Sequence, residues 1–268
     1  MEMWHAIVLS IIEGITEFLP ISSTGHMIIG SSLMGINDDA FVKNFTVIVQ
    51  FGAILSILVL YWKRFFIGWN AQKIQFYLKL FIAFLPAAVI GLATIHIVDR
   101  LLGSAVTVAI SFILGGIVLI FADKWFEKTE SSPVTIDTIT YKNVLLIGFF
   151  QCLALCPGVS RSGATILGAL TQKFNRKLAT EFSFFLAVPT LTAATLYKVF
   201  KIYKTIEPQQ ITILLVGNVI AFIVALIAIK AFIGIVSRGG FKYFGYYRII
   251  VGIVILVMLY SGYQMHDL

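Results

Sequence analysis

The sequence contains few charged residues and few cysteines, and both shortages narrow the class of protein. Only 12% of its 268 residues are charged and 59% are hydrophobic, whereas an average soluble domain has roughly 25% charged residues. The two cysteines, Cys152 and Cys156, lie in an apolar run without a histidine or cysteine cluster, so we interpret them as small buried thiols. A mean hydropathy of +0.95 makes lipid the expected solvent.

The excess of positive charge does not indicate nucleic-acid binding. The formal net charge is +7, but the basic residues lie between apolar segments rather than along one face, so membrane orientation explains them better. The chain starts Met1-Glu2-Met3-Trp4-His5, without the basic region of a cleavable signal peptide. We therefore expect no nucleic-acid partner, and we expect the mature helices to direct insertion.

Six stretches are long and apolar enough to cross a bilayer. A spanning helix needs about 20 apolar residues, because the hydrocarbon core is roughly 30 Å thick and a helix rises about 1.5 Å per residue. The sequence therefore predicts an all-α polytopic membrane protein that forms a single membrane domain over residues 1–268. The predicted spans are Phe41–Trp62, Phe76–Val98, Ser104–Ala122, Leu178–Tyr197, Ile211–Phe232 and Tyr243–Tyr263.

Two further apolar stretches, Trp4–Leu19 and Val144–Leu155, are too short to span. Each runs into a proline, then into serine-rich and glycine-rich residues, and then into a second short apolar piece. A helix that breaks at mid-depth and turns back fits this pattern better than a straight span. We therefore predict two re-entrant helical hairpins.

The two interrupted segments are related to each other at an offset of 138 residues, a register in which Glu13 faces Gln151. Each hairpin precedes three predicted spans, and this odd number means that a second copy must lie upside down in the membrane. We predict an inverted-topology repeat of about residues 1–125 and 139–268, whose broken helices meet near the midplane. The aligned identities are Ser22 with Ser160, Gly25 with Gly163, Ile28 with Ile166, and Gly30 with Gly168.

Lysine and arginine are unevenly divided between the two sides of this arrangement. One side holds fourteen and the other five, which places the larger group in the cytoplasm and both termini outside. The first hairpin then enters from outside and the second from inside, with Arg161 inside the second. The external group is Lys43, Arg100, Lys198, Lys201 and Lys204. The cytoplasmic group is Lys63, Arg64, Lys73, Lys79, Lys124, Lys128, Lys142, Lys173, Arg176, Lys177, Lys230, Arg238, Lys242 and Arg248.

Three charged residues fall within the hairpins: Glu13, Glu17 and Arg161. A charge at membrane depth costs roughly 2.5 to 3.5 kcal/mol on insertion scales, so such residues mark functional sites by default. Glu13 and Glu17 share one helix face, and two carboxylates this close resist joint ionisation unless a cation or an arginine compensates. The alternative is that the first helix lies at the interface with both carboxylates in water, which leaves the turn after Pro20 unexplained.

Each interrupted segment restarts a helix with hydroxyl-bearing residues, and free N–H groups together with the helix dipole favour an anion there. For either hairpin alone, simple helix capping explains these residues equally well. The planar guanidinium of Arg161 suits phosphate oxygens, and His26 is close enough to Ser23 on a helix to act as a general base or to protonate the leaving group. The residues at the two starts are Ser22, Ser23 and Thr24, and Ser160, Arg161, Ser162 and Thr165.

A phosphate ligand beside two glutamates needs a compensating cation. Mg²⁺ or Ca²⁺ takes carboxylate and phosphate oxygens together and so neutralises both. We therefore predict that a divalent cation is the cofactor and that Glu13 and Glu17 bind it.

Two segments carry a resemblance to a known family. Residues 13–26, Glu-Gly-Ile-Thr-Glu-Phe-Leu-Pro-Ile-Ser-Ser-Thr-Gly-His, and residues 157–163, Pro-Gly-Val-Ser-Arg-Ser-Gly, resemble the signature motifs of the undecaprenyl-pyrophosphate phosphatases associated with bacitracin resistance. The resemblance extends to Thr180–Phe184 and Tyr247–Arg248, and so to nearly the whole chain. It implies a phosphatase at the outer face of the bacterial cytoplasmic membrane that recycles the lipid carrier for cell-wall synthesis, depends on a divalent metal and forms homodimers.

The resemblance also implies roles for individual residues. Glu13 and Glu17 would bind the metal, Ser23 would attack the terminal phosphorus, and His26 would assist proton transfer, with Glu17 and Arg161 also catalytic. The spacing leaves three nucleophiles open: Ser23, His26 through a phosphohistidine, or a metal-bound water. A polyprenyl-phosphate transporter or flippase of the same architecture is the alternative function, although a carrier gains little from Ser23 and His26 beside two carboxylates. The implied substrate-binding residues are Ser22, Thr24, Ser160, Arg161, Ser162 and Thr165.

Overall fold

The computed structural model describes residues 1–102 and 104–261, and this part of the chain is helical without strands. Six of its segments are long and apolar enough to cross a membrane, which confirms the predicted all-α, multi-pass membrane fold. The helices are α1 (Met3–Thr16), α2 (Ser23–Leu33), α3 (Ala40–Ile48), α4 (Gln50–Leu60), α5 (Trp62–Phe66), α6 (Ala71–Ala93), α7 (Ile95–Leu102), α8 (Ala105–Trp125), η1 (Glu127–Ser131), α9 (Tyr141–Cys152), η2 (Leu153–Leu155), α10 (Arg161–Thr171), α11 (Arg176–Ile202), α12 (Pro208–Gly239) and α13 (Lys242–Tyr260).

The six candidate spans match the six predicted ones in order but differ at their ends and in continuity. The first span is interrupted at Val49, between α3 and α4, where the side-chain oxygen of Asn218 on α12 accepts a hydrogen bond from the N–H of Gly52 at 2.7 Å. The second span ends at Ala93, and residues 95–98 belong to the separate helix α7. The last two residues predicted for the sixth span, 262 and 263, lie outside the described residues.

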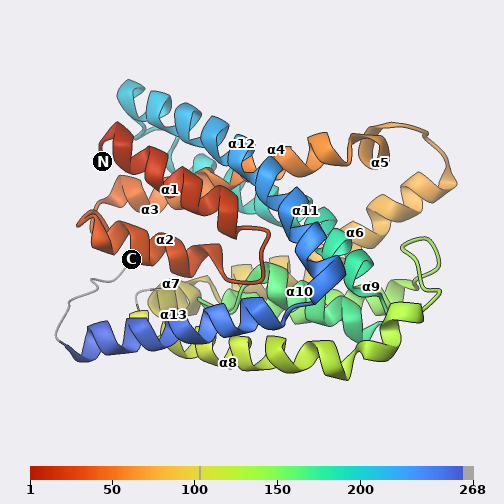
Figure 1. Ribbon diagram of the computed structural model, residues 1–268. Helices are drawn as coiled ribbons and strands as arrows, with labels where there is room; N and C mark the ends of the chain where they lie inside the picture. Colours follow the sequence, from red (N-terminus) through yellow and green to blue (C-terminus); the bar gives the residue numbers. More distant parts are fainter. Residues whose placement is uncertain (103, 262–268) are drawn as a thin grey trace.

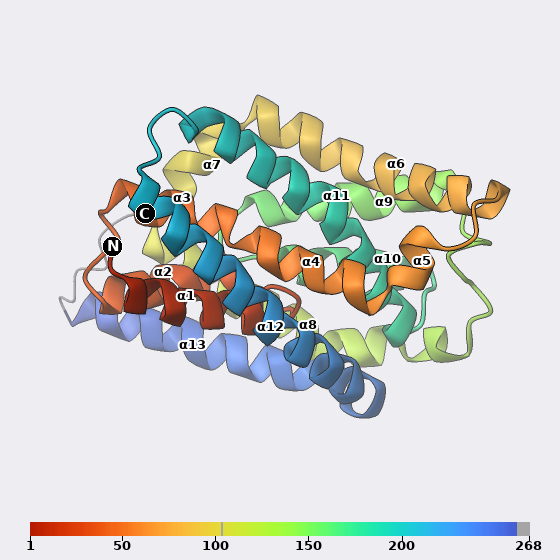
Figure 2. The same ribbon diagram turned by 90° about the horizontal axis from the view of Figure 1, so that it is seen from above.

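Helices from the first half of the chain pack against helices from the second half. The short helix α1 lies against α12, the short helix α9 lies against α6, and α8 lies alongside α13 (Figures 1 and 2). Close approach of α8 and α13 depends on two glycines, because a Cβ on Gly116 would lie 2.7 Å from the carbonyl oxygen of Gly245. Small residues at such a crossing let the backbones of membrane helices meet.

Phenylalanine rings fix the chain where α1 ends. Phe18 is fully buried and meets Phe184 of α11 edge-to-face at a centroid distance of 5.3 Å, and Phe184 in turn lies 6.0 Å from Phe232 of α12. Such aromatic pairs add about 0.5 to 1.5 kcal/mol beyond the area that they bury. Since Phe18 follows Glu17 directly, these contacts also set the position from which the Glu17 carboxylate leaves the backbone.

One basic residue lies elsewhere than the sequence predicts. We assigned Arg248 to the cytoplasmic side, but the residue is only 1% exposed and lies in the core, on the face of α13 that meets α8. Charge counts treat every arginine near a helix end as solvated, whereas the guanidinium of Arg248 is satisfied by main-chain carbonyls.

Candidate functional site

Two turns with matching geometry face each other at the centre of the molecule. After α1, the chain leaves the helical path until Ser22, whose side chain accepts a hydrogen bond from the N–H of Gly25 at 3.4 Å. After η2, Ser160 accepts one from the N–H of Gly163 at 3.1 Å. Both serines have a positive φ, 69° and 79°, a conformation that costs a non-glycine residue free energy and is found mostly at functional sites.

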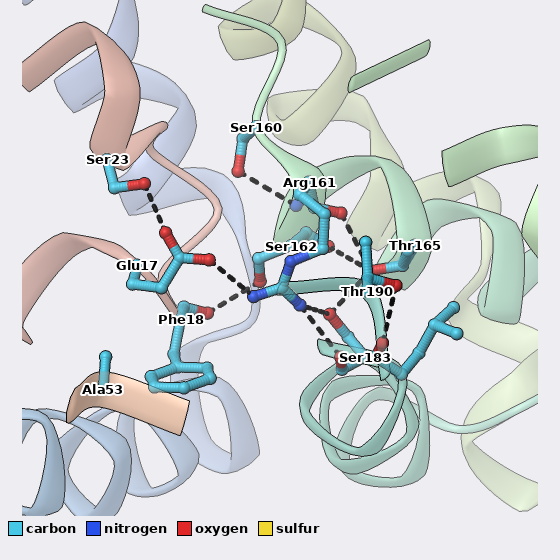
Figure 3. Close-up of polar contacts among 12 residues, drawn as sticks. Glu17, Phe18, Ser23, Ala53, Ser160, Arg161, Ser162, Thr165, Ser183 and Thr190 are labelled. Carbon is cyan, nitrogen blue, oxygen red and sulfur yellow. Dashed lines mark hydrogen bonds and ion pairs between the residues drawn. The ribbon is translucent and has the colours of Figure 1, made fainter. Parts of the chain in front are cut away.

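The two turns are joined by a buried ion pair between Glu17 and Arg161 (Figure 3). Arg161 Nη2 lies 2.8 Å from Glu17 Oε1, and the two side chains are 10% and 4% exposed. Arg161 Nη1 also donates to the carbonyl oxygen of Ser183 at 2.9 Å, which anchors the guanidinium to α11. The structure therefore brings the charges of the two sequence motifs together, as predicted.

Arg161 retains donor capacity that the protein does not use. Its Nε is buried and has no hydrogen-bond partner among the described residues. A guanidinium has five N–H donors in a planar fork that matches phosphate oxygens. Arg161 lines the central cavity and keeps a donor that no described protein group satisfies, which suits a phosphate ligand.

Ser23 shares the carboxylate of Glu17 with Arg161. Its hydroxyl donates to Glu17 Oε2 at 2.5 Å, while the other oxygen, Oε1, faces Arg161. Ser23 is 7% exposed and lines the central cavity. Glu17 is thus placed to accept the proton of the Ser23 hydroxyl, a relation that the spacing of the sequence did not reveal.

His26 is turned away from Ser23. Its Nδ1 lies 2.8 Å from the carbonyl oxygen of Ser22 and its Nε2 lies 2.7 Å from the hydroxyl of Tyr247, on which the imidazole stacks. Because a carbonyl only accepts, Nδ1 must carry the proton, and a neutral ring then accepts at Nε2 from Tyr247. The structure shows no hydrogen bond between His26 and Ser23, so the predicted reach of His26 to that hydroxyl is absent from this conformation.

Glu13 is fully buried, and neither of its carboxylate oxygens has a hydrogen-bond partner among the described residues. An unpaired buried carboxylate is costly, so two orphaned oxygens call for a proton or a cation. No group of three or more His, Cys, Asp or Glu side chains that could hold a metal occurs in the described part of the chain. Glu13 and Glu17 nevertheless fit Mg²⁺, which proteins often hold with one or two carboxylates while substrate phosphates supply further oxygens.

Two of the predicted substrate-binding hydroxyls are fully buried and bonded within the protein. Ser162 is fully buried and donates to the carbonyl oxygen of Phe18 at 2.7 Å, which links the second turn to the first. Thr165, also fully buried, lies 2.6 Å from the hydroxyl of Ser183. Thr24 and Ser160 line the cavity instead.

A cavity of about 470 Å³ lies beside the ion pair. Its polar end is formed by Glu17, Ser23 and Arg161, and the remainder is mostly apolar surface from α6 and α11, including Phe84 and Leu191. A second cavity of about 540 Å³ shares several lining residues with the first and contains Glu13. The basic residues lining this second cavity are Lys43, Lys198 and Lys201. The site therefore combines an apolar compartment with a charged one.

Residues that the sequence argument missed include Arg248, Ser183 and Tyr247. Ser183 and Tyr247 are polar residues within predicted spans, and both lie in segments that carry the family resemblance, Thr180–Phe184 and Tyr247–Arg248, which gave neither of them a role. Arg248 carried a usable signal, because it is followed directly by the apolar run Ile249–Val251 and so lies inside the predicted span. An arginine at that depth marks a functional or structural role by the same argument that identified Arg161.

Comparison with known proteins gives one consistent result. Residues 6–254 match the family described as bacitracin resistance protein BacA. The chain is 61% identical to the undecaprenyl-diphosphatase of Bdellovibrio bacteriovorus, covering 100% of this chain and 99% of that protein. It is 53% identical to the undecaprenyl-diphosphatase of Flavobacterium johnsoniae, covering 96% of each, and 43% identical to that of Campylobacter jejuni, covering 98% and 96%.

Proposed function

The chain belongs to the bacitracin resistance protein BacA family, and from this premise we propose how its residues act as an undecaprenyl-diphosphatase. The protein is a membrane phosphatase that hydrolyses undecaprenyl diphosphate to undecaprenyl phosphate and inorganic phosphate in the recycling of the lipid carrier. The observation that carries the mechanism is the Glu17 carboxylate, which contacts the Ser23 hydroxyl with one oxygen and the Arg161 guanidinium with the other.

In the proposed first step, Ser23 Oγ attacks the terminal phosphorus and its proton passes to Glu17. The new Oγ–P bond forms as the P–O bond to the leaving undecaprenyl phosphate breaks. Water then attacks the phosphoserine, the Oγ–P bond breaks, and Glu17 returns the proton to Ser23 as inorganic phosphate leaves. Arg161 stabilises the charge that develops on the transferring phosphoryl group, which is the main catalytic demand of this reaction class.

Glu13 and Glu17 would hold a divalent cation, and the two unpartnered oxygens of Glu13 support this proposal. Such a cation neutralises diphosphate oxygens and orients them. Without it, the diphosphate would lie beside two carboxylates, with Arg161 and the lysines of the second cavity to compensate. Glu13 would supply free oxygens for the ion, while the oxygens of Glu17 are also bonded to Ser23 and Arg161.

The inverted repeat with two re-entrant hairpins is part of the same proposal. Exchanging the two halves of the chain maps the contact of α1 with α12 onto the contact of α9 with α6, and it maps the α8–α13 pair onto itself. The matched positive φ angles of Ser22 and Ser160, which are 138 residues apart, also support it. In this arrangement both broken helices dip into the bilayer from opposite faces and meet at the ion pair.

The proposed site opens to the extracytoplasmic side of the cytoplasmic membrane. Three of the five basic residues that the sequence assigns to that side line the cavity containing Glu13: Lys43, Lys198 and Lys201. The apolar cavity lies within the range of about 300 to 1,000 Å³ typical of small-ligand sites, so it can hold the diphosphate and the first isoprene units while the rest of the chain stays in lipid. The homodimer implied by the resemblance stays a prediction.

Phosphate release from purified protein in detergent tests the proposed reaction. The protein is supplied with a prenyl diphosphate and Mg²⁺, and inorganic phosphate is measured with and without a chelator. We expect multiple turnovers that stop when the chelator is added and resume when Mg²⁺ is restored. Absence of phosphate release from a monodisperse sample would instead favour a carrier of the lipid.

A further inference from the structure

Arg248 makes an unusually complete set of main-chain contacts. All of its N–H donors are used, and every acceptor is a backbone carbonyl. Nε donates to Phe112, Nη1 donates to Pro20 and Val159, and Nη2 donates to Ser111 and Gly158, at distances of 2.8 to 3.3 Å. The guanidinium thereby binds the first turn, the second turn and α8 at one point.

These bonds fix the orientation of the peptide that precedes Ser160. No cis peptide occurs in the described residues, and in a trans peptide the N–H points opposite to the C=O. When Arg248 holds the carbonyl of Val159, the N–H of Ser160 therefore points away from the guanidinium. Ser160 lines the cavity beside Arg161, and its N–H has no hydrogen-bond partner among the described residues.

The same contacts hold Ser160 in its strained backbone conformation. A positive φ at a serine persists only where the surroundings over-determine it. On one side of Ser160 the carbonyls of Gly158 and Val159 are held by Arg248, and on the other side Ser162 is bonded to Phe18 of the first turn. The relative position of the two turns, and so of Ser23 and Arg161, depends on these hydrogen bonds.

We infer that Arg248 is a positioning residue for the proposed phosphatase reaction. It turns the Ser160 N–H toward a phosphate oxygen of the substrate and keeps the two turns in register, without touching the substrate itself. This inference rests on the proposed function, because the group received by the Ser160 N–H is the diphosphate.

Two variants disturb the contacts of Arg248 in different ways. Arg248→Lys keeps the charge but offers at most three donors from a single nitrogen in place of five in a plane. Gly115→Ala keeps Arg248 but places a Cβ 2.3 Å from Nη2, so the guanidinium must shift. Gly245→Ala is the matched control, because its Cβ crowds the same helix pair at 2.6 Å from the carbonyl oxygen of Gly116 without meeting the guanidinium.

Phosphate release is measured for wild type and all three variants, with rates normalised to monodisperse protein. We expect kcat to fall about 10- to 100-fold in Arg248→Lys and Gly115→Ala, as small misplacements of reacting groups do. KM for the prenyl diphosphate should stay within about threefold, because the apolar cavity is unchanged. Gly245→Ala, which disturbs the helix pair but does not meet the guanidinium, should lose clearly less kcat than Gly115→Ala.

The inference is overturned if Arg248→Lys keeps kcat within threefold of wild type, or if Gly245→Ala loses as much activity as Gly115→Ala. The second result would mean that helix packing, rather than peptide orientation, supports turnover. The wild-type rate separates this inference from the proposed function, since only failure of the wild type to release phosphate would count against the function.

Discussion

Replacing Arg161 with lysine separates the role of the charge from the role of the planar fork. In the structure, Nη1 is bonded to Ser183 and Nη2 to Glu17, and Nε has no partner among the described residues, so the guanidinium keeps donor capacity for a phosphate oxygen. A lysine ammonium has three donors on one atom, and holding both Glu17 and Ser183 would consume two of them. The variant therefore keeps Glu17 paired but presents a poorer phosphate contact.

The size of the effect follows from that lost contact. Removing one donor that stabilises developing charge costs about 2.7 to 4 kcal/mol, or roughly 100- to 1,000-fold in kcat. Stability should change little, because the buried Glu17 carboxylate keeps a cation beside it. Arg161→Ala is the less informative variant, since leaving a buried charge unpaired typically costs about 3 to 5 kcal/mol of folding free energy.

The assay compares phosphate release at saturating prenyl diphosphate with the midpoint of thermal unfolding. Arg176→Lys is the control, because Arg176 also forms an ion pair, 2.9 Å from Asp123, but does not line either described cavity. We expect the control to keep kcat within threefold of wild type. If Arg161→Lys also stays within threefold, the planar fork of Arg161 has no part in stabilising the transferring phosphoryl group.

Three further variants test the remaining assignments. Ser23→Ala should lower phosphate release at least about 1,000-fold, as loss of a nucleophile does, and acid-quenched wild type should contain phosphoserine; release within tenfold of wild type would move the attack to water. His26→Gln should lower phosphate release less than about tenfold, which is less than the loss of a general base usually costs, because the imidazole is bonded to Ser22 and Tyr247. A loss of phosphate release of about 1,000-fold would restore its role at Ser23. Glu13→Gln should raise the half-saturating Mg²⁺ concentration at least about tenfold, and an unchanged metal dependence would remove Glu13 from the cation site.

The sequence by itself determined the elements and their order. Length and hydropathy located the six spans, because twenty apolar residues in a row have few alternatives to a bilayer. Pro20 and Pro157, each followed closely by serines, indicated where the two short helices break. Proline and side-chain capping affect the backbone only within a few residues, so the sequence shows their effect directly. The expectation that Glu17 and Arg161 meet also came from the sequence, because the broken helices of the predicted inverted repeat meet near the midplane.

Only the tertiary structure decided how the site is connected. Glu17 bridges Ser23 and Arg161, and His26 faces Tyr247, which lies 221 residues away in the chain. Such partners depend on which helix faces which, and no local pattern encodes that choice. Arg248 shows this most clearly, because its charge alone placed it at the membrane surface, whereas carbonyls from the two turns and from α8 provide enough acceptors to bury it.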